Sequence, residues 1–321
     1  MFPIFPVDYP FYSNGGHSFI MDSSKQARSK PCPGPPPNLT GPWPAFLIFV
    51  SVLLVPLGQQ ALAQQPTKST RSNTSSKLPS KLPSSKASNL PSNPSNPSNN
   101  VQQLLAAGQT AQNAGRFDEA IATYNRVIAL SSNNSQNAAL ANLKIGNAYM
   151  VQRKFENAAI GYQRATTLNP DYAEAYNDLG EALGELKQYP RAIEAFNKAF
   201  VLDPTLLKAK YNQAVTYDRM GNFRYSEFVF RNLIKSSPQY SLAYDGLAVT
   251  LSKAGRAKEA IAFHEKAIAL DPREPSYYFN CAISYLMLRN TAKAMEQQEK
   301  LKAIDPAIAD RLASVIVKRQ M

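Results

Sequence analysis

Few side chains in this 321-residue sequence have the chemistry to transform a substrate. The chain holds two histidines, His17 and His264, and two cysteines, Cys32 and Cys281. A zinc site needs three or four Cys, His or carboxylate ligands, and a nucleophilic triad needs a histidine beside a serine or cysteine. Two histidines and two cysteines, widely separated in the sequence, argue against both a zinc site and a nucleophilic triad. We therefore expect no metal site, no cofactor and no catalytic residue.

Other motifs also point away from catalysis. Neither a GxGxxG sequence nor a phosphate-binding P-loop occurs in the chain. Glu181 and Glu185 are four residues apart, a spacing that places two carboxylates on one helix face, where such pairs are usually solvated. The sequence therefore predicts a protein that is not an enzyme, with no room left for a separate catalytic domain.

Five prolines reveal a regular period in the elements that follow. Pro170, Pro204, Pro238, Pro272 and Pro306 are successively 34 residues apart. Asn, Asp or Ser precedes each proline. We interpret these pairs as helix starts, because the polar side chain can cap free N–H groups and proline tolerates the first turn. A fixed period of this length indicates stacked copies of one unit.

Small and aromatic residues recur in the same register. The units are 101–134, 139–172, 173–206, 207–240, 241–274 and 275–308, with 135–138 as an insertion that lengthens a turn. Position 8 is always Gly or Ala and position 20 is always Ala or Ser, which lets two helices cross closely. Gly115, Gly221 and Gly255 share position 15, where a left-handed glycine would end the first helix.

Each unit is therefore predicted to be a helix–turn–helix hairpin. The best copies are NDLGEAL…YPRAIEAFNKAFVLDP (177–204) and YDGLAVTLSKAGRAKEAIAFHEKAIALDP (244–272). They resemble the tetratricopeptide repeat. The resemblance implies an all-α fold, a right-handed α-solenoid of six repeats over 101–308. Residues 309–321 would add a capping helix that covers the last repeat through Leu312, Val315 and Ile316.

The two residues with reactive side chains in the repeats fit core positions. His264 stands at position 24, which other units fill with Tyr124, Tyr162, Phe196 and Phe230. Cys281 shares a column with Ile145, Leu179 and Leu247. We expect a packed core histidine and a small buried thiol.

In tetratricopeptide proteins the first helices of the hairpins line a concave groove that holds an extended peptide or a partner helix. The resemblance implies that first-helix side chains pointing away from the second helices line such a groove here. The candidates are Leu143, Asn147, Met150, Glu174, Asn177, Glu181, Glu185, Lys208, Tyr211, Val215, Arg219, Phe279, Ile283 and Leu286. The alternative is that some of them only pack against neighbouring helices.

The candidate groove is acidic in the third unit and apolar in the sixth. This combination favours a protein or peptide ligand with basic and apolar anchors. The family's chaperone-docking members hold a terminal carboxylate with Lys, Asn and Arg, but Leu143, Asp178 and Asn212 occupy three of those positions here. We therefore expect no tight capture of an acidic C-terminus.

A second hypothesis is binding to nucleic acid or another anionic polymer, suggested by a net charge of +12 and a pI of about 9.5. Helical repeats that read RNA place polar base-reading side chains at fixed positions in every repeat. The candidate groove positions here vary from Glu to Phe, and the third unit would repel phosphate. Protein binding is therefore the first hypothesis.

The N-terminal 63 residues have the parts of a secretory signal. Three basic residues precede a 13-residue apolar stretch at 45–57, and Ala61-Leu62-Ala63 matches a signal-peptidase site. The apolar stretch is shorter than the roughly 20 residues that span a membrane. We expect export with cleavage after Ala63. An uncleaved membrane anchor through 45–57 and no export at all are the alternatives, and Met21 is an alternative start.

Residues 64–100 connect the two parts. They contain eleven Ser, six Asn, six Pro, five Lys or Arg and no Asp or Glu. Such a composition cannot bury enough apolar surface to offset the entropy of ordering, so we expect a disordered linker. Together these features predict an exported scaffold or adaptor that assembles or tethers a complex.

Overall fold

The computed structural model describes residues 97–131 and 135–320, which form thirteen α-helices. The signal-like segment, and the linker up to residue 96, lie outside the described residues. The helices are α1 (Pro97–Asn113), α2 (Phe117–Leu130), α3 (Ser135–Val151), α4 (Phe155–Leu168), α5 (Ala173–Glu185), α6 (Tyr189–Leu202), α7 (Leu207–Arg219), α8 (Phe223–Ser236), α9 (Ser241–Lys253), α10 (Ala257–Leu270), α11 (Pro275–Met287), α12 (Thr291–Lys302) and α13 (Pro306–Gln320).

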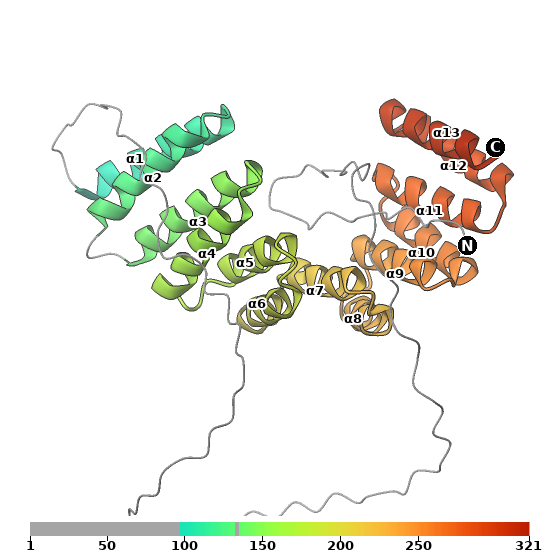
Figure 1. The fold of residues 1–321 in the computed structure, drawn as a ribbon, viewed down its shortest axis with the longest axis horizontal. Helices are drawn as coiled ribbons and strands as arrows, with labels where there is room; N and C mark the ends of the chain where they lie inside the picture. Colours follow the sequence, from blue (N-terminus) through green and yellow to red (C-terminus); the bar gives the residue numbers. More distant parts are fainter. Residues whose placement is uncertain (1–96, 132–134, 321) are drawn as a thin grey trace, which may run out of the picture. The chain divides into compact units, whose positions relative to one another are not determined.

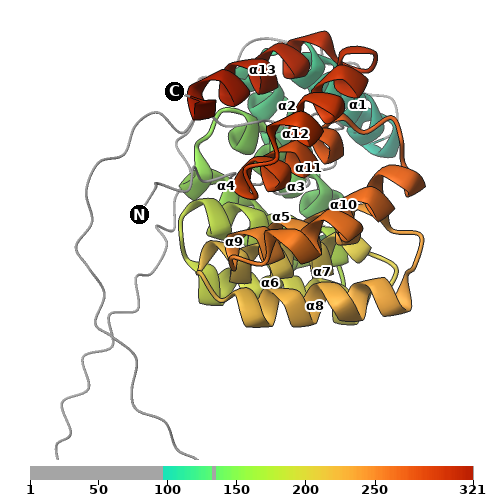
Figure 2. The ribbon, with the colours of Figure 1, turned by 90° about the vertical axis from the view of Figure 1, so that its right-hand side faces the viewer.

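The helices form consecutive antiparallel pairs, which can be followed in chain order in Figure 1 and in the turned view of Figure 2. Each helix packs against the next one along the chain. Contacts between next-but-one helices join odd-numbered helices, as between α5 and α7 or α7 and α9. In the middle of the stack, α5 and α7 lie on one side and α6 and α8 on the other (Figure 1). The predicted all-α repeat solenoid is thus confirmed.

Close crossing within a hairpin depends on the small residue at position 8. A Cβ atom added to Gly180 would lie 2.6 Å from a ring carbon of Phe196, and one added to Gly146 would lie 2.5 Å from Tyr162. Both rings are buried. The aromatic residue at position 24 therefore packs directly on the backbone of the first helix.

Each hairpin turns through one left-handed residue at position 15. Gly115, Gly221 and Gly255 have φ values of 72°, 75° and 82°, which confirms the predicted glycine role. The other three units keep the same conformation without glycine: Arg153, Lys187 and Arg289 each have a φ of 59°. The turn is therefore set by the repeat as a whole and not by glycine alone.

The prediction that Asn, Asp or Ser before proline starts a helix is correct only at Pro306. There α13 begins, and Asp305 Oδ1 accepts a hydrogen bond from the Ile308 N–H at 3.0 Å. Before the other four prolines, the polar residue is the C-cap of α4, α6, α8 or α10. Proline after a C-cap stops the helix, and the next helix begins three residues later.

Two boundaries differ from the sequence reading. Residues 135–138 do not lengthen a turn but form the first turn of α3, which has 17 residues against 13 in α5. Ala138, Ala139 and Ala141, at the end of this turn and just after it, favour the helical conformation. Helix α1 begins at Pro97, inside the segment read as a linker, since proline suits a first helical turn.

The predicted C-terminal cap is confirmed and begins three residues earlier than residue 309. Helix α13 packs against α11 and α12. Leu312 and Ile316 are buried in a cluster with Leu286 and Leu301, and Val315 packs against that cluster. The cap therefore covers the apolar edge that the last hairpin would otherwise expose.

Candidate functional site

The face formed by α1, α3, α5, α7, α9 and α11, here called the odd-helix face, carries the groove residues predicted from sequence. Their burial divides them into three groups. Leu143, Asn177, Glu181, Tyr211, Val215 and Leu286 are buried, Asn147, Met150, Glu185, Lys208, Arg219, Phe279 and Ile283 are partly buried, and Glu174 is exposed. The six buried side chains cannot touch a ligand in this conformation, whereas the other eight are accessible at least in part.

The buried polar members join α5 to α7. Glu181 Oε1 accepts hydrogen bonds from Asn177 Nδ2 at 2.8 Å and from Asn212 Nδ2 at 3.0 Å. All three side chains are at most 2% exposed. Burial raises the pKa of Glu181 well above its ordinary 4.5, and the nearby Asp178 carboxyl raises it further. This cluster acts as a polar tie between two repeats.

Ion pairs join consecutive odd-numbered helices. Between α5 and α7, Asp178 lies 3.9 Å from Lys208 and Glu185 lies 2.8 Å from Arg219. Between α7 and α9, Asp218 pairs with Lys253. Of the three carboxylates that suggested an acidic groove centre, Glu185 is therefore balanced by a cation of the next repeat.

The apolar end of the predicted groove is largely used inside the protein. Phe279 and Ile283 pack against the same cluster as Leu312 and Ile316 of α13, and Leu286 belongs to it. The cap thus competes with any ligand for these side chains. Among the apolar groove residues predicted from sequence, Met150 on α3 is partly accessible and lies away from the cap.

A hydrogen-bonded chain that the sequence did not reveal surrounds His264. Nδ1 lies 2.7 Å from Asp245 Oδ1, and Nε2 lies 3.1 Å from Ser284 Oγ. Asn280 Nδ2 donates to Asp245 Oδ2 at 2.9 Å, and Ser252 Oγ lies 2.8 Å from Ser284 Oγ. The five residues come from α9, α10 and α11.

This Asp–His–Ser order is that of a nucleophilic triad, but its surroundings are not. Asp245, His264 and Ser284 are 2%, 0% and 1% exposed, so no substrate can reach the serine. The predicted packed histidine is confirmed, and its hydrogen bonds bind three helices together.

Cys281 is also buried, as expected, and burial raises the pKa of its thiol to about 12. Its thiolate population at neutral pH is therefore very small. Within residues 97–131 and 135–320, no group of three His, Cys, Asp or Glu side chains is arranged to hold a metal ion. In the same part of the chain no helix combines the length and apolar character needed to cross a membrane.

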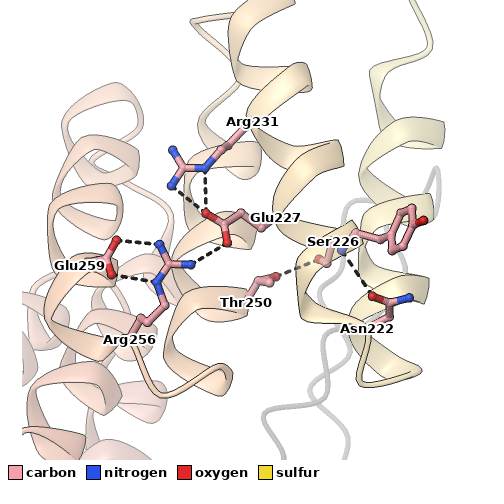
Figure 3. Close-up of polar contacts among 8 residues, drawn as sticks. Asn222, Ser226, Glu227, Arg231, Thr250, Arg256 and Glu259 are labelled. Atoms are coloured by element: carbon pink, nitrogen blue, oxygen red, sulfur yellow. Dashed lines mark hydrogen bonds and ion pairs between the residues drawn. The ribbon is translucent and has the colours of Figure 1, made fainter. Parts of the chain in front are cut away.

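A second charged network lies on the even-numbered helices, between α8 and the turn before α10. Glu227 accepts from Arg231 and from Arg256, the latter at 2.6 Å, and Arg256 also pairs with Glu259 (Figure 3). Beside it, Ser226 and Thr250 share a buried hydrogen bond of 3.0 Å that joins α8 to α9 (Figure 3). Inter-repeat polar ties therefore occur on both layers.

Comparison with known proteins agrees with this architecture. Residues 105–166, 143–206 and 243–276 match family models described as tetratricopeptide repeat. The chain is 25% identical over 162 residues to anaphase-promoting complex subunit 3 of Schizosaccharomyces pombe, covering 50% of this chain and 24% of that protein. It is 28% identical over 163 residues to cell division cycle protein 27 homolog B of Arabidopsis thaliana, covering 51% and 22%. The match spans less than a quarter of each relative.

Two solved structures share the fold. A tetratricopeptide repeat protein from Parabacteroides merdae is 22% identical, with a TM-score of 0.56 over 70% of this chain and 86% of that one. PilW, described as a widely conserved type IV pilus biogenesis factor, is 21% identical, with a TM-score of 0.56 over 67% and 98%. Identities this low show the fold alone. The family matches therefore show tetratricopeptide repeats in residues 105–206 and 243–276, and the helix pairs from α1 to α12 share one repeated geometry.

Proposed function

We propose that the odd-helix face binds an extended peptide or a partner helix, and that the chain thereby assembles or tethers an exported or membrane-associated complex. The observation that carries this proposal is the accessibility of side chains on consecutive odd-numbered helices. Asn147 and Met150 on α3 are partly exposed and Glu174 on α5 is exposed. A ligand running across these helices would meet polar, apolar and acidic contacts in turn.

The side chains of the odd-helix face that are accessible and not already paired determine which ligand residues can act as anchors. Glu174 belongs to no ion pair within the described residues, whereas Glu185 already pairs with Arg219. A Lys or Arg side chain of the ligand therefore gains most at Glu174. Met150 offers a flexible apolar contact that adapts to different side chains. A ligand with one basic and one apolar anchor fits this half of the face.

The proposal of export rests on the N-terminal sequence alone. A basic region, the apolar stretch at 45–57 and the triplet at 61–63 occur in the order of a secretory signal. N-terminal sequencing of the protein purified from its native host tests this part separately. A mature chain that begins at Gln64 supports cleavage, and a chain that retains residues 45–57 and sediments with membranes supports an anchor instead.

A photo-crosslinking experiment with a matched control tests the binding face. A photoreactive amino acid replaces Glu174 in one version of the full chain and Glu194 in another. Both are exposed carboxylate positions of the third repeat, but Glu194 lies on α6, in the layer of even-numbered helices. We expect a crosslinked protein partner from position 174 and none from 194.

Charge reversal gives the second arm of this test. Glu174→Lys should weaken capture of that partner about tenfold, since it replaces attraction of a basic anchor by repulsion, and Glu194→Lys should leave capture unchanged. Equal crosslinking at both positions would count against the odd-helix face. Crosslinking of position 174 to RNA, lost above modest salt, would favour the anionic-polymer hypothesis instead.

A further inference from the structure

Helix α8 exposes two aromatic side chains. Tyr225 is 58% exposed and Phe228 is 63% exposed. They are three residues apart, so they lie on the same face of the helix. One side of the Tyr225 ring stacks on Tyr217, with ring centroids 5.5 Å apart and an angle of 24° between the planes. Tyr225 is therefore held in place while Phe228 projects beside it into solvent.

Repeat packing does not account for these aromatics. One repeat earlier, the same two positions hold Arg191 and Glu194 on α6. One repeat later they hold Glu259 and Ala262 on α10, and two repeats later Lys293 and Glu296 on α12. Those helices form the same hairpins with charged or small side chains there. The aromatic pair is thus a property of α8 alone.

The charged side chains of α8 that form no ion pair within the described residues have one sign. Arg224 and Lys235 are exposed, and neither forms an ion pair within residues 97–131 and 135–320. Glu227, the acidic residue of α8, accepts from both Arg231 and Arg256 (Figure 3). Arg231 also lies over the Phe263 ring, 5.5 Å from its centroid. The two free cations therefore flank Phe228 with no free carboxylate between them on this helix.

We propose that this exposed face of α8, made of Arg224, Tyr225, Phe228 and Lys235, is a second docking surface that binds an acidic segment of a partner protein. Apolar side chains of that segment would pack on Phe228 and Tyr225, and its carboxylates would pair with Arg224 and Lys235. These two cations are eleven residues apart, about 16 Å along a helix at 1.5 Å per residue. A partner segment of about three helical turns spans this length.

The chemistry of the face favours an acidic protein segment over other occupants. Two free cations give little attraction to an anionic membrane, since basic segments that bind anionic lipid carry clusters of about four to eight Lys or Arg. Nucleic acid gains most from a longer basic track with several accessible ring faces, and here Tyr217 already occupies one side of Tyr225. The chain's own segment 64–100 carries five basic residues and no acidic ones, so it is repelled.

Selection from a displayed library of random peptides, about 16 residues long, tests the proposal with the full-length chain. Four variants are compared with the wild type. Phe228→Ser and the double variant Arg224→Glu, Lys235→Glu alter the face. Val201→Ser removes another exposed apolar side chain, 74% exposed at the end of α6, as a matched control. Glu174→Lys alters the odd-helix face, so failure of one surface is distinguishable from failure of the other.

We expect one peptide class that the wild type, Val201→Ser and Glu174→Lys retain and both α8 variants lose. These peptides should be rich in Asp, Glu and large apolar residues, and fluorescence anisotropy should show about tenfold weaker binding to Phe228→Ser. Circular dichroism of each variant checks that the helices remain. No enrichment of such a class, or its equal recovery by Phe228→Ser, would overturn the proposal.

The same variants decide among the other occupants. Binding to phosphatidylserine vesicles or to single-stranded oligouridylate that depends on Phe228, without an acidic peptide class, would replace the proposed partner by a membrane or a nucleic acid. A wild-type dimer in sedimentation that Phe228→Ser dissociates would identify the face as a contact between copies of this chain. Each of these results would also overturn the proposal.

Discussion

Glu185 on α5 and Arg219 on α7 are 34 residues apart, one repeat length, and their side chains form an ion pair of 2.8 Å. One repeat further, the same position holds Lys253, which pairs with Asp218 on α7. Both side chains of the Glu185–Arg219 pair are only 16% exposed. Partial burial reduces screening by solvent, so the pair should contribute more to stability than an exposed one.

A double-mutant cycle measures this contribution. Glu185→Ala, Arg219→Ala and the double variant should give a coupling energy of about 1 kcal/mol in chemical denaturation of the full chain. The control is the exposed pair of Arg116, the N-cap residue of α2, and Glu119 in its first turn, where about 0.3 kcal/mol is expected. A coupling no larger than the control value would show that the pair only fills space between the repeats.

His264 gives a sharper prediction, because sequence and structure lead to opposite expectations. Position 24 holds Tyr or Phe in the first four units, so His264→Phe looks conservative. In the structure the substitution removes the Nδ1 partner of Asp245, a carboxylate that is 2% exposed. We expect a loss of about 3 kcal/mol in the free energy of unfolding, since a buried carboxylate that keeps Asn280 but loses its imidazole partner is costly.

The control for His264→Phe adds a second change. Asp245→Leu in the same chain removes the carboxylate left without its imidazole partner, and should recover part of the lost stability in thermal and denaturant unfolding. If His264→Phe alone unfolds at the same denaturant concentration as the wild type, the hydrogen-bonded chain through Ser284 contributes nothing measurable.

The repeat pattern was enough to predict the fold because each hairpin packs its two helices together through residues at the same positions. Gly180 and Phe196 illustrate this, since a small residue at position 8 and a ring at position 24 must meet for two helices to cross closely. The C-terminal cap was predictable for a similar reason, because Leu312 and Ile316 share a helix face. Local rules were less reliable at Pro204, where the same Asp–Pro pair can start one helix or stop another.

The candidate site was only partly predictable, because burial of a first-helix side chain depends on the neighbouring repeat. Their spacing predicts that Glu181 and Glu174 both face a groove, but Asn212 of the next repeat covers Glu181, whereas Glu174 stays exposed. The hydrogen bond between Asp245 and His264 joins α9 to α10. The two residues stand at different positions of the repeat, so comparing one position across the units does not reveal it. His264 and Gln298 both deviate from the aromatic residues at position 24, and pairing His264 with nearby polar residues of its own and the following hairpin would have been the signal for this network.

Glu181 predicts a specific dependence of stability on pH. Burial raises its pKa well above 4.5, so the folded protein holds the proton to higher pH than the unfolded chain does. A carboxyl of this kind stabilises the fold least at high pH: the free energy of unfolding falls as pH rises from about 4.5 through the folded pKa. Glu181→Gln keeps an acceptor for Asn177 and Asn212 but cannot ionise. Its free energy of unfolding should therefore exceed that of the wild type at about pH 8, with the difference vanishing near pH 4.

Urea denaturation at a series of pH values measures this effect, with about 1.4 kcal/mol expected for each pH unit by which the pKa is raised. Burial also raises the pKa of Asp178, an effect that Lys208 opposes, and Asp178 titrates in both proteins, so the comparison isolates Glu181. Glu194→Gln, on the exposed side of α6, should reproduce the wild-type profile. If the free energy of unfolding depends on pH in the same way for Glu181→Gln and the wild type, burying the ionised Glu181 carboxylate costs no measurable stability.

Lys187 offers a gain in stability. It is exposed and left-handed, with a φ of 59°, in the turn where Gly221 and Gly255 occupy the same position of their units. A left-handed conformation costs a residue with a Cβ atom about 1–2 kcal/mol, and the greater freedom of glycine in the unfolded chain returns only part of this. Lys187→Gly should therefore raise the free energy of unfolding by about 1 kcal/mol, and Gly221→Lys should lower it by a similar amount. If Lys187→Gly instead unfolds more easily than the wild type, the turn relies on the lysine itself and not on the backbone conformation that the six units share.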